Sequence, residues 1–492
     1  MKQVSVVVFL LLVYTQFVTA IPRDWLERVN AGKMLYGSKE PLDRHLMPIT
    51  SNGYIGHVVT TGTLHLAGVF NGANNSVTGL SHRADIPAPF SIEIQNDLVS
   101  EGSALDLERG IFYRRMHSDL YHIEQRWYAH RRYRNAIVAE IEVINNSTNT
   151  MILALNLTQD FTSDFTFSSK KSEDTVIWVG TTKVPETKDS HLTTVASVST
   201  TVPSTIQIDK MSTTTFYFIA VYYSTLDSKQ PEDDCRKLYA ELWSKRTILQ
   251  KEHIETMKIV WSRGIDIEGN LTLAAAINSS LYDIVSNMRP DWPYSTSPGG
   301  IANNAYHGHT FWDSETWMYP TLLLFFPDIA KSMLEYRFLR LEEAMKKALW
   351  SGHKGASFPW ESAFTGYECT CCAPINIEGI EEIHITGDIA FAFIQYYYAT
   401  KDLTWLRTTA WPVLYQIAEF WNSRAILKDG VYNINDVQCP DESSTHVNNS
   451  IYTNVVASRS LEFASYAAKI LGKQENPQWL IVAKNVKIPF DS

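Results

Sequence analysis

The pattern of apolar and polar positions divides the chain into a β-rich part and a helical part. Residues 137–144 show the two-residue period of a half-buried strand. Residues 213–223 are dense in Thr, Phe, Tyr and Val, which favour a pleated surface. Short strands of this kind, separated by Ser/Thr-rich and Pro-containing connections, predict a large antiparallel sandwich over residues 21–232.

The period of the apolar residues changes after this region. Leu238, Leu242, Ile254 and Met257 recur at helical spacing, so we predict a helical linker over residues 233–268. Further helices are predicted from the spacing and from Pro and Gly positions, at 271–288, 330–349, 383–399, 403–421 and 452–471. A succession of such helices favours a solenoid-like stack or a closed helical barrel over residues 269–492.

The N-terminus is typical of a secretory signal peptide. Lys2 precedes an apolar run over residues 4–18, and small residues at Thr19 and Ala20 suit cleavage, which predicts a signal peptide over residues 1–20. An uncleaved signal anchor is the alternative. No later stretch is long and apolar enough for a membrane span, so we expect a secreted or lumenal protein, lysosomes included. Glycosylation sequons fit this compartment, at Asn74, Asn145, Asn146, Asn156, Asn270, Asn278 and Asn448.

Charge and cysteine content exclude some classes of partner. The net charge is −10 with no basic stripe, so a nucleic-acid partner is not expected. The five cysteines are Cys235, Cys369, Cys371, Cys372 and Cys439. Their spacing lacks the paired ligands of a zinc site, so we do not predict a metal site. A disulfide between the 369–372 cluster and Cys439 remains open.

Three segments between the predicted helices combine aromatic residues with carboxylates. The first contains Trp312, Asp313 and Glu315. Asp313 or Ser314 would cap the next helix in a structural interpretation. In a functional interpretation, the aromatic ring stacks on a sugar and the carboxylate accepts hydrogen bonds from its hydroxyls. The spacing alone favours neither.

The second segment places Trp360 beside Glu361, at what we take to be a helix entrance. The third is Pro440-Asp441-Glu442, with Asn448 and Asn449 downstream. Pro followed by acidic residues commonly opens a helix, so a cap is the more frequent explanation of the third segment alone. Glycoside hydrolysis nevertheless needs two carboxylates about the scissile bond, and these segments supply several.

Taken in order, the segments resemble glycoside hydrolase family 65. The resemblance rests on residues 311–318, 358–363, 382–384 and 419–421, and on Pro-Asp-Glu with residues 447–455. That family includes acid trehalases, maltose and kojibiose phosphorylases, and the animal glucosidase acting on glucosylgalactosyl-hydroxylysine. The chain is most similar to the last of these. The implied fold is a β-supersandwich, a helical linker and an (α/α) six-hairpin-type barrel, incomplete at its C-terminus.

The resemblance also implies roles for individual residues. Glu442 would be the general acid of an inverting α-glucosidase. The substrate-binding residues would be Trp312, Asp313, Glu315, Trp360, Glu361 and Asn449. The implied partner is a carbohydrate, glucosylgalactosyl-hydroxylysine of collagen-type glycans, with trehalose as the alternative substrate. No cofactor is implied.

Two departures from the family pattern matter. The family's general base, or the phosphate site of its phosphorylases, lies in a later barrel segment than this chain includes. Family members also continue the acid motif as Pro-Asp-Glu-Tyr-His, whereas Ser443 and Ser444 follow Glu442 here and the histidine is His446. A non-catalytic sugar-binding protein or an inactive truncated product is therefore the alternative of another class, and a phosphorylase is a third.

Overall fold

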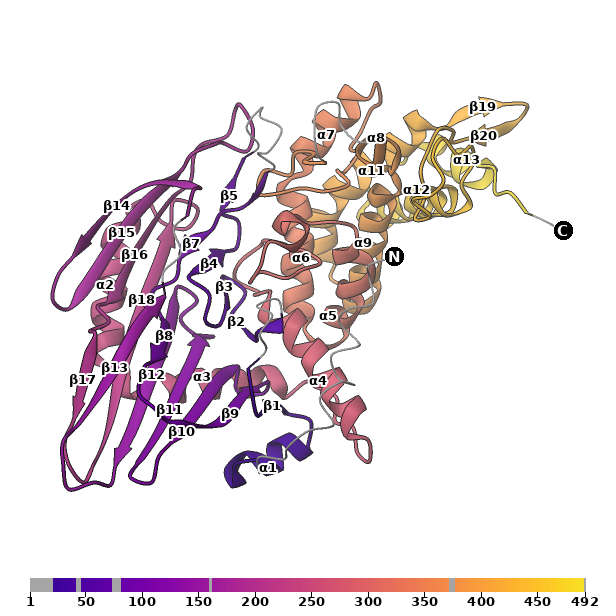
Figure 1. Cartoon of the computed structure of the whole chain (residues 1–492). Coiled ribbons are helices and arrows are strands. Elements are labelled where there is room, and N and C mark those ends of the chain that lie inside the picture. The colour runs from indigo at the N-terminus through magenta and orange to yellow at the C-terminus, as the bar shows by residue number, and fades with distance from the viewer. Residues whose placement is uncertain (1–20, 41–45, 73–80, 159–161, 371–376, 491–492) are drawn as a thin grey trace.

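The computed structural model describes residues 21–40, 46–72, 81–158, 162–370 and 377–490. A β-rich region lies beside a helical region, with the sheets on the left and the helices on the right of Figure 1. The predicted signal peptide over residues 1–20, the Asn74 sequon, Cys371 and Cys372 lie outside the described residues.

The β-rich region is built on one nine-stranded antiparallel sheet. Its strands in spatial order are β1 (Met34–Gly37), β9 (Val99–Asp106), β10 (Ile111–His117), β11 (Tyr121–Ala129), β12 (Ala136–Asn145), β18 (Ser212–Ser224), β16 (Thr194–Thr200), β15 (Thr175–Thr182) and β14 (Phe165–Lys171). The strands predicted at 137–144 and 213–223 are β12 and β18, which pair directly with each other. The predicted antiparallel β-domain is therefore confirmed.

Smaller sheets lie against one face of this sheet and close the sandwich. They are β17 (Thr205–Ile208), β13 (Met151–Thr158) and β8 (Ser91–Ile94); β2 (Ile49–Ser51), β3 (Ile55–Val58), β4 (Thr63–Leu66) and β7 (Ile86–Pro87); and β5 (Phe70–Asn71) with β6 (His82–Arg83). Ile137, Ala139 and Ile141 of β12 point into the core between these sheets. Ala136 and Val138, at the alternate positions, are buried in a second core on the opposite face. The strand is thus buried on both faces rather than half-buried as predicted.

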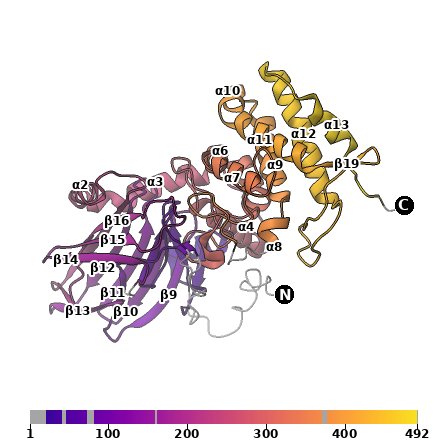
Figure 2. The ribbon, with the colours of Figure 1, turned by 90° about the horizontal axis from the view of Figure 1, so that it is seen from above.

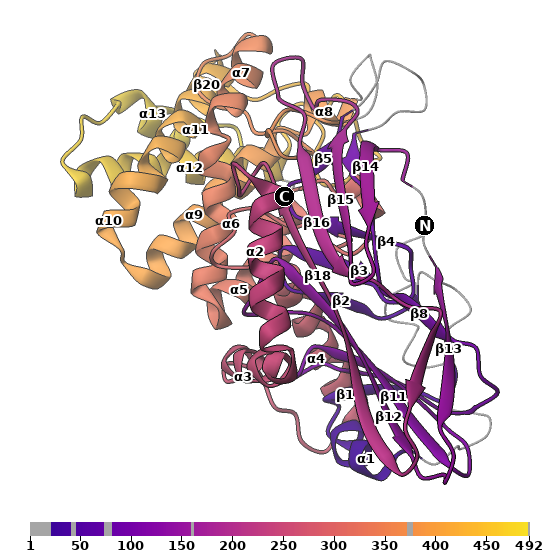
Figure 3. The ribbon, with the colours of Figure 1, turned by 90° about the vertical axis from the view of Figure 1, so that its left-hand side faces the viewer.

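Helices cover that opposite face. They are α1 (Arg23–Asn30), α2 (Pro231–Ser244), the short η3 (Arg246–Ile248) and α3 (Leu249–Trp261). Cys235, Leu242 and Leu249 are buried in the same core as Val198 and Ile219 of the sheet. Figure 3 shows α2 lying across β16 and β18. The segment predicted as a linker is helical, and it also supplies the apolar surface that buries the second face of the sheet.

The helical region follows. Its elements are α4 (Leu271–Ser286), η4 (Ala305–Gly308), η5 (Ser314–Met318), α5 (Tyr319–Phe325), α6 (Pro327–Leu339), α7 (Leu341–Trp350), α8 (Ile377–Glu381), α9 (His384–Thr400), α10 (Leu403–Trp405), η6 (Leu406–Ala410), α11 (Trp411–Arg424), the hairpin β19 (Ile426–Lys428) and β20 (Val431–Asn433), α12 (Ile451–Leu471) and α13 (Pro477–Asn485). The helix predicted at 330–349 is two helices, because the chain leaves helical geometry at Arg340. Seen from above, α10 to α13 lie farthest from the sandwich (Figure 2).

Helix α9 is the centre of this region. It is buried on nearly every side, from His384 to Tyr397, which explains why its sequence is apolar all round. A Cβ at Gly387 would lie 2.4 Å from the side chain of Val456, so glycine allows α12 to approach α9 closely. No helix within the described ranges is both long enough and apolar enough to cross a bilayer.

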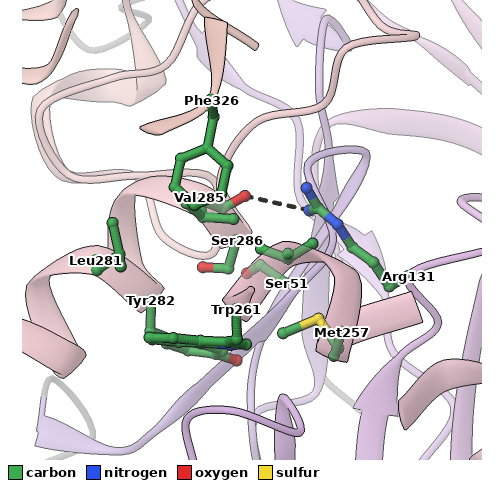
Figure 4. Close-up of a pocket in the computed structure, with 10 residues that line it drawn as sticks. Ser51, Arg131, Met257, Trp261, Leu281, Tyr282, Val285, Ser286 and Phe326 are labelled. Atoms are coloured by element: carbon green, nitrogen blue, oxygen red, sulfur yellow. Dashed lines mark hydrogen bonds between the residues drawn. The ribbon is translucent and has the colours of Figure 1, made fainter. Parts of the chain in front are cut away.

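Buried arginines of the β-rich region hold the two regions together. The Arg131 guanidinium donates to the carbonyl of Val285 in α4 at 3.1 Å, and Arg83 donates to the carbonyls of Gly300 and Gly308. A cavity of about 10 Å³ at the junction, the size of one water, is lined by residues that include Arg131, Trp261, Tyr282 and Phe326 (Figure 4). It is too small for a sugar and contains none of the predicted site residues.

Candidate active site

Trp312 and Asp313 stand at the start of η5, a single π-helical turn. Such turns are rare and recur at functional sites. Asp313 occupies the N-cap position, but its side chain makes no capping bond, and the Ser314 hydroxyl donates instead to the carbonyl of Thr296. The structural interpretation of these residues as helix caps is therefore wrong. Burial first, and then the charge of Glu315, raise the pKa of Asp313.

Glu315 lies on the other side of the same turn and faces the interior. Its oxygens bind Nε and Nη2 of Arg337 at 2.7 and 2.9 Å, and both residues are 1% exposed. The same Arg337 group donates to the carbonyl of Phe311, just before Trp312. This pair fixes the turn that presents Trp312 and Asp313. A substrate contact by Glu315 stays a prediction without geometric support.

Trp360 and Glu361 lie in an extended loop, not at a helix entrance as predicted. The loop pairs with residue 310 through a bridge between Thr310 and Ser362, which brings the first two segments side by side. The indole of Trp360 packs edge-on against Phe311, with ring centroids 5.0 Å apart. Glu361 Oε2 lies 3.0 Å from Nδ1 of His309. Burial, and then Arg83, lower the pKa of His309 to about 3, so His309 is neutral in this contact.

A buried ion pair holds this loop in place. Lys347 of α7 binds Glu368 at 2.5 Å, and Glu368 accepts hydrogen bonds from the backbone N–H groups of Trp360 and Glu361. Lys347 and Glu368 are 9% and 6% exposed. Neither was singled out by sequence analysis, because two residues 21 positions apart on a helix and a loop carry no periodic signal.

A cluster of charges at the N-terminus of α9 connects the segments. The ring of His384 lies between two carboxylates, with Nδ1 2.7 Å from Asp388 and Nε2 3.2 Å from Glu382. Trp360 Nε1 donates to the same oxygen of Glu382 at 2.8 Å, and the Tyr452 hydroxyl donates to Asp388 at 2.7 Å. The other oxygen of Glu382 is buried and has no hydrogen-bond partner within the described part of the chain.

The charge state of His384 follows from this geometry. Burial opposes a charge on the ring, but the hydrogen bonds to Asp388 and Glu382 outweigh it and raise the pKa of His384 to about 9. The indole of Trp312 packs edge-on against this imidazolium at 5.1 Å between centroids. Trp312, Trp360 and the His384 cluster thus form one continuous wall. Sequence analysis left His384 unassigned and did not identify Asp388.

Glu442 lies in a loop that returns to this wall. Residues 440–444 form a turn, and the next helix, α12, begins at Ile451 with Ser450 as its cap. The structural interpretation of Pro-Asp-Glu as a helix opening is therefore wrong. The Gln438 side chain donates to the carbonyl of Glu442 at 3.1 Å.

The electrostatics of Glu442 suit a carboxyl that keeps its proton. Partial burial raises the pKa of Glu442, and the charges of Glu382, Glu378 and Asp313 raise it further, while His384 lowers it. These influences also place Glu442 within electrostatic reach of Glu382 and Asp313. The structure therefore brings Glu442, Asp313, Trp312 and Trp360 to one part of the molecule.

Asn449 has a different position. It adopts a left-handed backbone, with φ of 58°, and is 8% exposed. Its amide oxygen accepts from the N–H of Ile434, and its amide nitrogen donates to Asn433. These contacts connect Asn449, just before α12, to Asn433 at the end of β20 and to Ile434 after it. Its role in substrate binding stays a prediction that no contact supports.

Candidate metal ligands come together at one place in the described ranges. Ligand atoms of Glu381, Asp436 and His446 lie within 4.8 Å of one another. The histidine nitrogen is 2.7 Å from each carboxylate oxygen, whereas two ligands of one tetrahedral ion, bound at about 2.0–2.1 Å, lie about 3.3 Å apart. We therefore describe this group as a hydrogen-bonded ion triad. Among the described cysteines, Cys235, Cys369 and Cys439 are free thiols, so Cys439 makes no disulfide with Cys369.

This arrangement has a proton donor and a sugar-binding surface of the kind that glycoside hydrolases use. A carboxyl with a raised pKa can protonate a leaving oxygen, and aromatic walls with a neighbouring carboxyl can hold a sugar ring. The polar supports of Trp360 and Trp312, which are Glu368, Glu382 and Arg337, come from other elements.

The chain is similar in sequence and fold to known proteins that act on glycosides. Residues 279–491 match the model of the glycosyl hydrolase family 65 central catalytic domain. The chain is 36% identical over 502 residues to the protein-glucosylgalactosylhydroxylysine glucosidase of Dictyostelium discoideum, covering 96% of this chain and 69% of that protein. It is 40% identical over 280 residues to the kojibiose hydrolase of Flavobacterium johnsoniae, covering 56% of this chain and 40% of that protein. Among solved structures, it superposes on a putative kojibiose phosphorylase from the human microbiome with a TM-score of 0.76 at 17% identity, covering 94% of this chain and 69% of that one.

Proposed function

Because this chain belongs to glycoside hydrolase family 65, we propose that it hydrolyses the glucosyl unit of glucosylgalactosyl-hydroxylysine in collagen-type glycans. It carries the catalytic domain of a glycoside hydrolase, and a carbohydrate is its substrate. The observation that carries the proposal is the position of Glu442, within electrostatic reach of Asp313 and of Glu382, the residue that binds the Trp360 indole.

In the proposed reaction, Glu442 donates its proton to the glycosidic oxygen as the bond to glucose breaks. Water attacks the opposite face of the sugar and gives its proton to a second carboxylate, the general base that the family pattern supplies from a later barrel segment, and the anomeric configuration inverts. Asp313 accepts hydrogen bonds from glucosyl hydroxyls, and Trp312 and Trp360 pack on the ring. His384 packs against the Trp312 indole, and Glu382, which binds His384, accepts the hydrogen bond from the Trp360 indole.

The substrate is inferred from the relatives. Similarity to a glucosylgalactosylhydroxylysine glucosidase extends over 96% of this chain, whereas similarity to the kojibiose hydrolase extends over 56%. The higher identity of the shorter match, 40% against 36%, makes kojibiose the second candidate. Trehalose is the third substrate to be tested, since the family resemblance includes trehalases.

A glucose-release assay tests the proposal. The chain, with any natural C-terminal extension, is incubated with glucosylgalactosyl-hydroxylysine, kojibiose or trehalose, each with and without phosphate. We expect release from the first substrate, without a phosphate requirement and with β-glucose as the initial product. Release only with phosphate would identify a phosphorylase. Binding of glucose without turnover of any substrate would instead identify a non-catalytic sugar-binding protein and contradict the proposal.

We also propose that the chain enters the secretory pathway. The support is the apolar N-terminal run and the sequons. Asn146, Asn156, Asn270 and Asn448 are exposed in the structure and accessible to a glycan. Expression with residues 1–20 intact, followed by analysis of cell medium and lysosomes, tests this. Retention of the unprocessed chain in the cytosol would contradict it.

A further inference from the structure

The loop that carries Glu442 is closed at its neck by Glu381, Asp436 and His446. Nδ1 of His446 lies 2.7 Å from Glu381 Oε1 and 2.7 Å from Asp436 Oδ1. The backbone N–H of His446 donates to the second oxygen of Glu381 at 2.8 Å. The backbone N–H of Gln438, on the other side of the neck, donates to the carbonyl of Glu381. One residue of α8 thus holds both ends of the loop.

The position of the imidazole favours a positive charge. Nδ1 of His446 must carry a proton to lie at hydrogen-bonding distance from two carboxylates, and the two adjacent negative charges favour the imidazolium over the neutral ring. The hydrogen bond to Asp436 first, and then the charge of Glu381, raise the pKa of His446. The Arg424 guanidinium donates to the carbonyls of Asn435 and Asp436, so it faces the triad from α11. Among the described residues, the charged groups that contact or face His446 are therefore the carboxylates of Glu381 and Asp436 and the guanidinium of Arg424.

The backbone at the neck of the loop has an unfavourable left-handed conformation at two residues, which surrounding contacts must stabilise. Asp436 and His446 have φ of 56° and 55°, a region that residues other than glycine seldom adopt. The residue after each of them, Val437 and Val447, pairs with the other in a bridge of two backbone hydrogen bonds, with N···O distances of 3.0 and 2.8 Å. The side chains of the two unusual residues are the ones that bind each other. Their contact therefore opposes relaxation of the loop on which Glu442 stands.

We propose that charged His446 is a positioning residue that holds the acid loop, residues 437–447, closed, and that the loop loosens when His446 loses its proton. The inference rests on the proposed function only in taking Glu442 as the acid. The His446 imidazole holds its proton more tightly in the closed loop than in the open one. It therefore stabilises the closed loop fully at pH values below the ordinary histidine pKa, about 6.5, and this stabilisation is lost as the pH rises. The loop is accordingly held most firmly in acidic solution, below the ordinary histidine pKa.

Hydrogen exchange of the full chain tests the inference without using activity. Exchange of peptides covering residues 437–447 is measured in Glu442→Gln from pH 5.5 to 9 and expressed as protection relative to intrinsic rates. We expect protection to fall above pH 6.5. Adding His446→Gln should remove this protection at every pH. Adding Asp436→Asn should make the protection fall at lower pH than in Glu442→Gln alone. A one-unit move of the midpoint corresponds to about tenfold in the proton affinity of the closed loop. His122→Gln, an exposed histidine on β11, is the matched control and should leave the profile unchanged.

Two results would overturn the inference. Protection that does not depend on pH, or that is equal in the parent and in His446→Gln, would show that the imidazolium does not hold the loop. Protection that EDTA removes and Zn²⁺ restores would assign the neck to a bound cation. In the Glu442-containing chain, His446→Gln should lower kcat more than it changes KM, since a misplaced acid affects the reaction step. The hydrogen-exchange experiment does not depend on hydrolysis of any glycoside. Failure of the proposed function and failure of the inference about His446 can therefore be told apart.

Discussion

The carboxylate of Glu315 and the guanidinium of Arg337 form a two-pronged ion pair in the interior of the helical region, at 2.7 and 2.9 Å. Glu315 directly follows the Asp-Ser pair that begins η5, and Arg337 comes from α6. The pair therefore ties the turn carrying Trp312 and Asp313 to the helix behind it. Its effect on the site is structural, through the position of that turn.

Removing one member of this pair should destabilise the fold. Glu315→Gln leaves the Arg337 charge buried without a counterion, which typically costs about 3–5 kcal/mol. Unfolding free energy in urea is the measurement. Glu343→Gln is the control, because its pair with Lys346 is exposed and such pairs contribute about 0–1 kcal/mol. Equal stability of the two variants would contradict the structural role of Glu315.

Glu442→Gln should abolish hydrolysis without unfolding the chain. A general acid contributes about 10²–10⁴-fold to the rate, and residue 442 lies on an exposed turn. Initial rates of glucose release and the melting temperature are measured together. Glu342→Gln, on the exposed face of α7, controls for the loss of a surface charge. Full activity of Glu442→Gln on an unactivated glycoside would remove this residue from the mechanism.

Stability should fall with rising pH because of His384. Its pKa is raised to about 9, so its contribution is complete below the ordinary value of 6.5 and is lost as the pH rises through 9. The loss is at most about 3 kcal/mol by linkage. Unfolding free energies at pH 6.5 and 9.5 should differ less in His384→Gln than in the native chain. His353→Gln is the control, because burial lowers the pKa of His353 and its titration lies at lower pH. An unchanged pH slope in His384→Gln would disprove the charged state.

Glu186 links the β-rich region to the loop after Trp360. Its carboxyl accepts hydrogen bonds from the N–H and hydroxyl of Thr365, and burial raises its pKa to about 7. The folded state therefore favours the protonated form, and this stabilisation is lost as the pH rises from about 4.5 to 7. Glu186→Gln should raise the melting temperature at pH 7.5 and change it little at pH 5. A lower melting temperature at pH 7.5 would show that the charged form is the stabilising one.

The sequons divide into two classes in the folded chain. The amide nitrogens of Asn145 and Asn278 are buried and donate to backbone carbonyls, at 2.9 Å to Asn149 and 3.0 Å to Gly32. Glycopeptide mapping of secreted protein should find both unmodified and sugars only at exposed sites such as Asn156 and Asn270. A glycan at Asn278 in folded, active protein would contradict the packing of α4.

Much of the fold follows from local sequence patterns. Alternation at residues 137–144 predicted β12, and apolar spacing predicted α9 and α12 within a few residues of their ends. The resemblance carried by the loop segments selected Glu442 and Asp313, which look like helix caps when each is taken alone. The end that failed, at Arg340, is a break inside an apolar run, where the periodicity continues although the backbone leaves helical geometry. The helix predicted at 403–421 is continuous, because the π-helical turn η6 joins α10 to α11 without leaving helical backbone angles.

Thus the sequence by itself determined the order of strands and helices and the family, because periodicity and motif order are properties of neighbouring residues. Only the tertiary structure decided which charges meet. It directed Glu315 to Arg337 and placed His384 between Glu382 and Asp388. It also closed the acid loop through Glu381, 65 residues before His446. Such contacts depend on how elements pack in space, and ionic attraction across that distance in sequence leaves no periodic pattern to detect.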